Sequence, residues 1–204
     1  FEESLTIDRE LADSLGTPES RRDLAISLDN VGRVAEQSGD LVIAGRCFEE
    51  SLGIQCELVA LLGTPESRRD LAISLDNVGR MAERRGDLEA ADRYFEESLT
   101  IDRELADSLG TPQSRRDLAL SLNSVGRVAE QRGDLEAADR YYKESMTILH
   151  EIAELVGTPQ AIEDLVLALG SRVHIAAELG GSALVEHLEA EPSNLEEIVV
   201  ENRS

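Results

Sequence analysis

The amino-acid sequence predicts an all-α fold, an α-solenoid built from antiparallel helix pairs. The first observation is a tandem repeat: Phe1, Phe48, Phe95 and Tyr142 each open a near-copy of one block, and they lie 47 residues apart. The second is the helix start signal Thr-Pro, which recurs at the same spacing. The third is an apolar stripe of helical period in each copy. Repeats of this length cannot bury their apolar faces alone, so they must stack on their neighbours.

The repeat organises residues 1–190 as one solenoid. A half repeat, three full repeats, a degenerate capping repeat and a tail follow one another as residues 1–16, 17–63, 64–110, 111–157, 158–190 and 191–204. In the capping repeat, Val173 stands where the other copies have glycine, and Glu189 stands where they have an aromatic residue. Such drift is typical of a terminal repeat.

The first helix of each repeat is predicted to start at its Thr-Pro pair. Thr17 is a favourable N-cap, Pro18 has the fixed φ of a first helical position, and Glu19 adds a favourable charge to the first turn. We expect this helix to end near Gln37. Its core stripe consists of Leu24, Leu28, Val31 and Ala35.

The second helix follows a tight turn. Gly39 can take the left-handed conformation, and Asp40 can cap the next helix, which is predicted to end near Leu62. Phe48 is the large core side chain of this helix. The recurring glycine at Gly32 would cost about 1 kcal/mol relative to alanine in a helix interior, so we expect it to mark a close approach of the two helices.

The repeated residues resemble the tetratricopeptide repeat. The residues that carry the resemblance are Leu28, Val31, Gly32, Ala35, Gly39, Ala44, Phe48 and Ser51, and the pattern returns in phase twice. The usual repeat of that family has about 34 residues, and the longer repeat here is similar to those of kinesin light chains and of bacterial signalling proteins. The resemblance implies a right-handed superhelix whose concave side is lined by the first helices.

Charge and cysteine usage limit the possible partners. With 42 acidic and 20 basic residues, the net charge is -22, which disfavours nucleic acid and anionic membrane because both need a basic surface. Cys47 and Cys56 lie nine residues apart on one predicted helix and point to opposite sides, so a disulfide between them is excluded. Free thiols and the lack of a secretory leader favour the cytoplasm. No apolar run approaches the roughly 20 residues that cross a bilayer.

The candidate binding surface is the face of each first helix opposite its core stripe. Equivalent positions form four ladders: Arg22, Arg69 and Arg116; Ile26, Ile73, Leu120 and Leu167; Asn30, Asn77 and Ser124; and Arg33, Arg80 and Arg127, ending in His174. Amides can bond an extended backbone, guanidinium groups can bind carboxylates, and an aliphatic row can receive an apolar side chain. The resemblance implies that the asparagines hold a bound peptide or protein segment.

A purely structural interpretation of this face stays open. Asp29 and Arg33 form an i,i+4 pair that would stabilise the helix by about 0.2 to 0.5 kcal/mol, and the next repeat has the same pair. The arginines can therefore be paired on a solvated surface. The aliphatic ladder favours a ligand, because an apolar row on a charged face invites one.

Nothing in the sequence indicates catalysis or a cofactor. His150, His174 and His187 are not spaced as a metal site, and the recurring glycines fit helix ends or packing positions rather than a phosphate-binding loop. We expect neither an active site nor a metal. The leading hypothesis is a protein- or peptide-binding scaffold within a larger signalling or regulatory protein.

Two other hypotheses stay open. One is an architectural array that assembles with itself. The half repeat lacks a first helix, so an apolar face with Phe1, Leu5, Ala12 and Leu15 is predicted to lie open and to form a homo-oligomer. The other is the regulatory region of an enzyme whose catalytic domain lies outside this chain.

Overall fold

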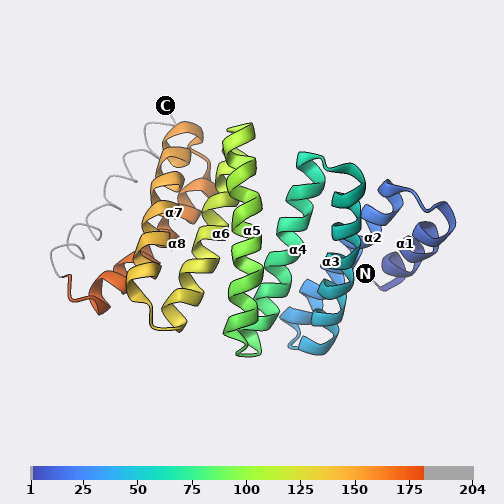
Figure 1. The fold of residues 1–204 in the computed structure, drawn as a ribbon, viewed down its shortest axis with the longest axis horizontal. Coiled ribbons are helices and arrows are strands. Elements are labelled where there is room, and N and C mark those ends of the chain that lie inside the picture. Colours follow the sequence, from blue (N-terminus) through green and yellow to red (C-terminus); the bar gives the residue numbers. More distant parts are fainter. Residues whose placement is uncertain (1, 182–204) are drawn as a thin grey trace. The chain divides into compact units, whose positions relative to one another are not determined.

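A computed structural model describes residues 2–181, with side chains from Leu5 onward. These residues form eight α-helices and no strand (Figure 1), which confirms the all-α helical-repeat fold. The expectations about Phe1, His187, Glu189 and the tail from residue 191 lie outside this range. The helices are α1 (Glu2–Leu15), α2 (Pro18–Gln37), α3 (Leu41–Leu62), α4 (Pro65–Arg84), α5 (Leu88–Leu109), α6 (Pro112–Gln131), α7 (Leu135–Val156) and α8 (Pro159–Glu178).

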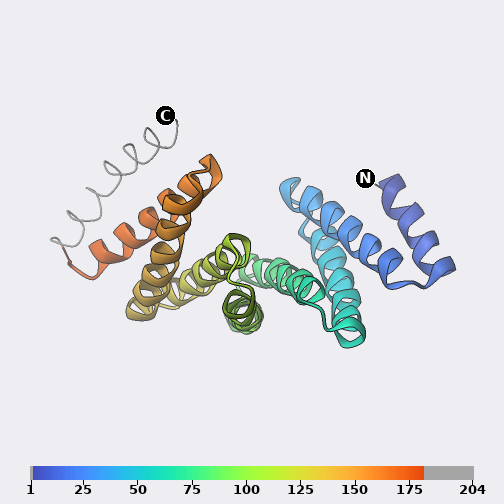
Figure 2. The ribbon, with the colours of Figure 1, turned by 90° about the horizontal axis from the view of Figure 1, so that it is seen from above.

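The chain divides into two compact units, Phe1–Ile101 and Asp102–Ser204, with the boundary inside α5. In the first unit α1 packs against α2, α2 against α3 and α3 against α4 (Figures 1 and 2). In the second unit α6 packs against α7, and α7 packs against α8. Sequence neighbours are therefore also spatial neighbours, as a helical repeat requires.

Local signals set the helix ends where the sequence predicts them. The Thr17 hydroxyl oxygen accepts a hydrogen bond from the Ser20 backbone N–H at 3.2 Å, and Pro18 follows as the first helical residue. The Asp40 carboxylate accepts from the Ile43 N–H at 3.0 Å and so caps α3. Gly63 ends α3 with a φ of 59°, a left-handed conformation that glycine adopts without strain. The predicted ends at Gln37 and Leu62 are both confirmed.

An aromatic ring on the second helix of each repeat packs directly onto a glycine of the first. Phe48 is completely buried, and a Cβ atom added at Gly32 would lie only 2.7 Å from its ring. The corresponding distance from Gly79 to the ring of Phe95 is 2.8 Å. The predicted close approach is confirmed, since no larger residue fits here without displacing the ring.

A buried serine joins the two helices of each repeat by a second contact. The hydroxyl donates a hydrogen bond to a backbone carbonyl 26 residues earlier in the chain. The three bonds run from Ser51 to Ala25 (3.2 Å), from Ser98 to Ala72 (3.0 Å) and from Ser145 to Ala119 (2.8 Å). Each bond satisfies a hydroxyl that is almost fully buried.

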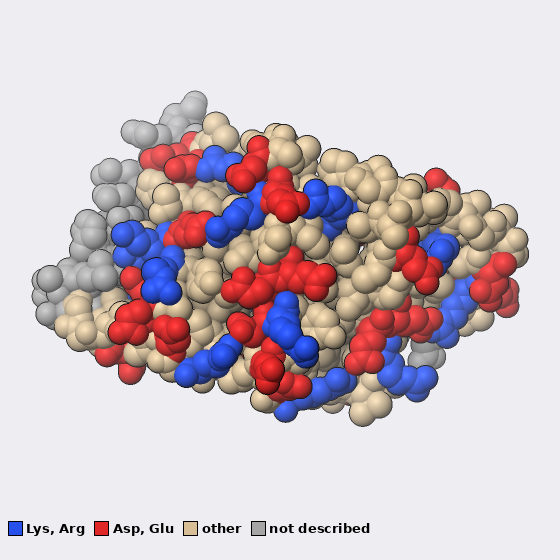
Figure 3. Space-filling model, viewed as in Figure 1, with Lys and Arg blue, Asp and Glu red and all other residues tan. Residues whose placement is uncertain are grey.

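Ion pairs link second helices of successive repeats on the surface. Arg9 contacts Glu50 at 2.5 Å, and Arg103 contacts Glu144 at 2.9 Å, each across 41 residues of sequence. All four side chains are about half exposed, so each pair contributes about 1 kcal/mol at most. Acidic and basic residues are interspersed on the visible surface (Figure 3).

The prediction for the half repeat is wrong in part. Leu5 and Ala12 do not lie open: they pack with Leu24 and Leu28 of α2 in one apolar cluster. The reason is that the core face of α1 meets the following first helix, α2. The large apolar side chains that α1 exposes are Ile7 (56%), Leu11 (45%) and Leu15 (61%).

Candidate binding site

A groove of about 240 Å³ lies on the first unit. Its lining comes from α2, α3 and α4, and it contains four residues of the predicted ladders. The lining residues are Ile26, Asp29, Arg33, Gln55, Asp70, Ile73 and Asn77. The structure thus brings equivalent positions of two successive first helices to one depression, with Gln55 contributed by the second helix between them.

The aliphatic ladder is exposed at each of its four positions. Ile26 is 43% exposed and Ile73 is 42% exposed, and both line the groove. In the second unit, Leu120 is 39% exposed and Leu167 is 66% exposed. These side chains take no part in the core, so their apolar surface is available to a ligand.

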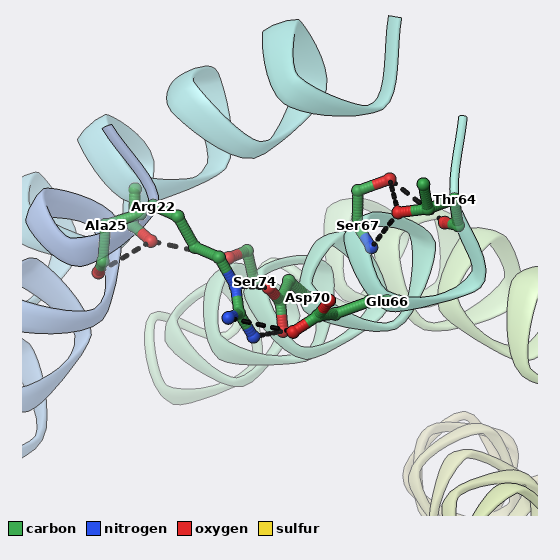
Figure 4. Close-up of polar contacts among 8 residues, drawn as sticks. Arg22, Ala25, Thr64, Glu66, Ser67, Asp70 and Ser74 are labelled. Atoms are coloured by element: carbon green, nitrogen blue, oxygen red, sulfur yellow. Dashed lines mark hydrogen bonds and ion pairs between the residues drawn. The ribbon is translucent and has the colours of Figure 1, made fainter. Parts of the chain in front are cut away.

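The first arginine ladder has a structural role. Arg22 of α2 donates from Nε to Asp70 of α4 at 2.5 Å and contacts Glu66 at 2.8 Å (Figure 4). The hydrogen bond to Asp70 raises the pKa of the Arg22 guanidinium. Arg116 makes the equivalent bond from Nε to Asp164 in the second unit, at 2.5 Å.

The middle member, Arg69, is half-buried and is not without a partner either. The structural interpretation of this ladder is therefore favoured at Arg22 and Arg116, where the guanidinium links one first helix to the next.

The amide ladder and the second arginine ladder are bonded to each other. Arg33 donates to the Asn30 side-chain oxygen, and Arg80 donates to that of Asn77 at 2.7 Å. Arg80 also reaches Asp76 at 3.4 Å, and its guanidinium lies 6.0 Å from the centre of the Phe48 ring. Because the arginines occupy the amide oxygens, only the N–H groups of the asparagines can donate further, and the buried Asn77 already hydrogen-bonds Asp29.

The same ladders continue in the second unit with different chemistry. Ser124 and Arg127 are half-buried and engaged by neighbours. His174 is 61% exposed, and its Nε2 lies 3.3 Å from Glu130 Oε1. Glu130 also accepts a hydrogen bond from the Tyr142 hydroxyl at 2.8 Å. Burial and this bond raise the pKa of Tyr142.

Three polar residues that were not predicted to bind a ligand also line the groove: Asp29, Gln55 and Asp70. Oδ1 of Asp29 and Oε1 of Gln55 are buried, and among the described residues neither atom has a hydrogen-bond partner. Burial raises the pKa of Asp29 to about 6, although hydrogen bonding from Ser51 and Asn77 and the charge of Arg33 lower it. A buried carboxyl of this kind marks a candidate functional position.

Comparison of the repeats could have identified Gln55 from the sequence alone, because it departs from the residue at the equivalent positions. Asp8 and Asp102 occupy the equivalent positions, and each accepts a hydrogen bond from a serine of the next first helix. With glutamine in that place, the corresponding Ser74 hydroxyl lies 3.4 Å from Ser51 instead. Gln55 also lines a second cavity, of about 150 Å³, beside the Arg22 to Asp70 pair. The residue that departs from the repeat pattern, Gln55, therefore lies in the groove.

The described residues form neither a candidate metal site nor a candidate membrane-spanning helix. Between residues 2 and 181, no group of three or more His, Cys, Asp or Glu side chains is arranged to hold a metal ion. Among the helices that the structure describes, none combines the length and the apolar character that a membrane crossing needs. Cys47 is buried and Cys56 is exposed, and both are free thiols.

The chain is similar to known repeat proteins. The tetratricopeptide repeat model matches residues 70–151. A variant of the nearly identical TPR-like repeats of a Podosopora anserina kinesin light chain has a TM-score of 0.59 and 14% identity, covering 99% of this chain and 88% of that one. BtubC (BKLC) from P. vanneervenii has a TM-score of 0.56 and 14% identity, covering 96% of this chain and 87% of that one. The de novo designed helical repeat protein DHR64 has a TM-score of 0.52 and 25% identity, covering 92% of this chain and 99% of that one. No curated protein matches the sequence.

The two natural structures share the fold of this chain. Their sequence identity of 14% supports no conclusion beyond the fold. The family match contains two copies of the glycine and aromatic pair, Gly79 with Phe95 and Gly126 with Tyr142. The first full repeat has the same pair at the same spacing, in Gly32 and Phe48. Residues 70–151 of this chain therefore match the tetratricopeptide repeat, and the first full repeat has the same pair of packing residues at the same 47-residue spacing.

Proposed function

We propose that this chain is a protein-binding scaffold whose first-unit groove holds an extended segment of a partner. Tetratricopeptide repeats generally mediate protein–protein interaction and are generally not catalytic. One observation carries the proposal: Ile26 and Ile73 are each more than 40% exposed in a depression that is otherwise lined by polar and charged residues. Covering each of them would contribute roughly 1 to 2 kcal/mol of binding free energy.

The polar groups of this face suit an extended backbone. The N–H groups of the Asn30 amide can donate to carbonyl oxygens of a bound segment, since its own oxygen already accepts from Arg33, whereas the buried Asn77 amide hydrogen-bonds Asp29 at the floor of this face. We assign the contact surface to these residues with the two isoleucines, and Arg22 to holding successive helices together. Leu120, Ser124, Arg127 and His174 form the corresponding surface of the second unit, for which we propose the same role.

A selection experiment tests the proposal. A random peptide library displayed on phage is selected against the full chain, and the peptides obtained are measured against Ile73→Asp and Ile43→Asp. Both isoleucines are similarly exposed, at 42% and 46%, but Ile43 does not line the groove. We expect Ile73→Asp to lose at least about tenfold in affinity, because it places an unpaired charge beneath the ligand. Ile43→Asp should bind like the unmodified chain. Full affinity of Ile73→Asp, with an unchanged circular dichroism spectrum, would eliminate this groove.

A second candidate function is self-association through α1. Ile7, Leu11 and Leu15 are spaced i, i+4 and i+8 and form one exposed apolar stripe on this helix. The net charge of -22 opposes association most strongly at low salt. We expect sedimentation velocity to show dimers that strengthen as salt is added and that Leu11→Glu abolishes. A monomer at high protein and high salt concentration would contradict this candidate.

We also infer that the chain works in a reducing compartment, such as the cytoplasm. Both cysteines are unpaired, and both belong to the groove-bearing unit. Burial raises the pKa of the Cys47 thiol, which keeps it protonated and unreactive. Cys56 is exposed, so an oxidising environment would leave it open to intermolecular disulfides.

A further inference from the structure

The groove of the first unit contains two acceptor atoms that no described group satisfies. They are Oδ1 of Asp29 and Oε1 of Gln55. Gln55 is only 2% exposed, and it lines this groove and also the cavity of about 150 Å³ beside the Arg22 to Asp70 pair. A buried acceptor without a donor is unfavourable, because it has lost water and gained nothing in return. These two atoms therefore lack hydrogen-bond donors, although Ser51 and Asn77 also hydrogen-bond the Asp29 carboxyl group.

The next repeat shows what kind of donor this position takes. Asp76 is the equivalent of Asp29, and its carboxylate has the guanidinium of Arg80 at 3.4 Å, within its own helix. In the first repeat, Arg33 donates to the Asn30 amide instead, and Asp29 Oδ1 stays without a partner. The second repeat thus pairs this carboxylate directly with a guanidinium group, whereas in the first repeat Arg33 acts on Asp29 through its charge and leaves Oδ1 without a bonded cation.

The charges around Asp29 favour a positive ligand. The groups that face it are Arg33 on its own helix, Ser51 on α3, and Asp70 and Asn77 on α4. Asp70 is already paired with Arg22. Two carboxylates and one guanidinium line the groove, on a chain that carries a net charge of -22. An acidic segment would meet repulsion here, whereas a basic segment would be attracted.

We infer that this groove recognises a lysine or arginine side chain that lies beside an apolar side chain in the bound protein segment. The inference rests on the proposed function and names the chemistry of its ligand. The ammonium or guanidinium group would donate to Asp29 Oδ1 and to Gln55 Oε1, while the apolar neighbour would cover Ile26 and Ile73.

Recognition of this kind depends on pH. Burial raises the pKa of Asp29 to about 6, so the carboxyl is ionised at neutral pH and becomes protonated in mild acid. A bound cation stabilises the ionised form, and by linkage protonation weakens the binding of the cation. Arg33 and Asp70 are the charged groups beside it, and they act on its pKa in opposite directions.

The test uses peptides selected on the full chain and a pair of matched variants. A selected peptide is compared with its citrulline form, in which the basic group becomes a neutral isostere, on Asp29→Asn and on Asp76→Asn. We expect a basic residue next to an apolar one to be enriched in the selection. The citrulline form and Asp29→Asn should each lower affinity about tenfold, and the two losses should not add, because both remove the same charged bond.

Two controls sharpen the outcome. Asp76→Asn should leave affinity unchanged, because that carboxylate has its own arginine. Acidification to about pH 5 should weaken binding to the unmodified chain but not to Asp29→Asn. Asparagine occupies the equivalent position of the third repeat, as Asn123, so the variant is compatible with the fold.

The possible failures are distinguishable. Peptides whose binding is lost in Ile73→Asp but which carry no basic residue would overturn this inference and leave the proposed function standing. An Asp29→Asn chain that binds a basic peptide with unchanged affinity would do the same. A selection that yields no peptide sensitive to Ile73→Asp would overturn both.

Discussion

Replacing Asp29 by asparagine should stabilise the unliganded chain at neutral pH. Burial raises the pKa of this carboxyl group from 3.8 to about 6, which means that the folded state disfavours the ionised form. At about 1.4 kcal/mol per pH unit, the difference corresponds to about 3 kcal/mol at most. Asparagine keeps the size and the acceptor of the side chain and removes only its charge. The third repeat provides a precedent in Asn123, whose Oδ1 is likewise buried.

The gain should depend on pH in a defined direction. Below about pH 4 the carboxyl group is protonated in the folded and unfolded states alike, so its charge has no effect on stability. Between there and about pH 6 the folded state binds more protons than the unfolded state, and the unmodified chain loses stability as the pH rises. Above about pH 6 the full penalty is present. The advantage of Asp29→Asn should therefore be about 3 kcal/mol near pH 7.5 and about half of that near pH 5.

Urea unfolding followed by far-ultraviolet circular dichroism at these two pH values measures the effect. Asp76→Asn is the matched control, because its carboxylate is paired with Arg80 and gains nothing from losing its charge. We expect its midpoint to stay the same or to fall. An Asp29→Asn midpoint that is unchanged or lower near pH 7.5 would refute the assignment of a buried carboxylate without a directly bonded cation. A gain in stability that does not shrink in acid would refute its electrostatic origin.

Three further substitutions test the packing. Gly53→Ala should raise the free energy of unfolding by about 1 kcal/mol, because an added methyl group at Gly53 meets nothing within 4 Å in a helix interior. Gly79→Ala should lower it by about 1 to 3 kcal/mol, because its Cβ would lie 2.8 Å from the Phe95 ring, and thermal melts of the two variants should shift in opposite directions. Arg22→Met should destabilise the first unit by about 1 to 2 kcal/mol in urea, since it leaves the largely buried Asp70 without its cation, and an unchanged midpoint would show that the pair is merely a surface contact.

Helix limits and the tightest contact between paired helices could be predicted from the sequence because local chemistry decides them. Thr17 and Pro18 start a helix by capping and by a fixed φ, and neither depends on distant residues. The approach of Gly32 to Phe48 was predictable because the pair recurs at one spacing, and a glycine in a helix interior has an energetic cost that packing must offset.

The pairing of the polar residues could not be predicted, because it depends on which helices stack. Arg22 bonds Asp70 across 48 residues, one residue more than the repeat, and only the offset between successive first helices brings them together. The exposed face of α1 was misjudged for the same reason, since Leu5 is covered by α2 of the following repeat. Asp29 needed both the groove and its burial to be noticed, whereas Gln55 stands out in the sequence only as a departure from the aspartate of the neighbouring repeats.

The serine bond inside each repeat bears on how chains of this kind can change in length. The bond from Ser98 to Ala72 closes 26 residues of a single repeat, and the ring of Phe95 meets Gly79 within that same repeat. A deletion or duplication of one whole copy would leave these contacts intact, whereas loss of part of a copy would separate the partners. Gain or loss of whole copies can therefore alter the array by 47 residues at a time without creating a new core inside a repeat.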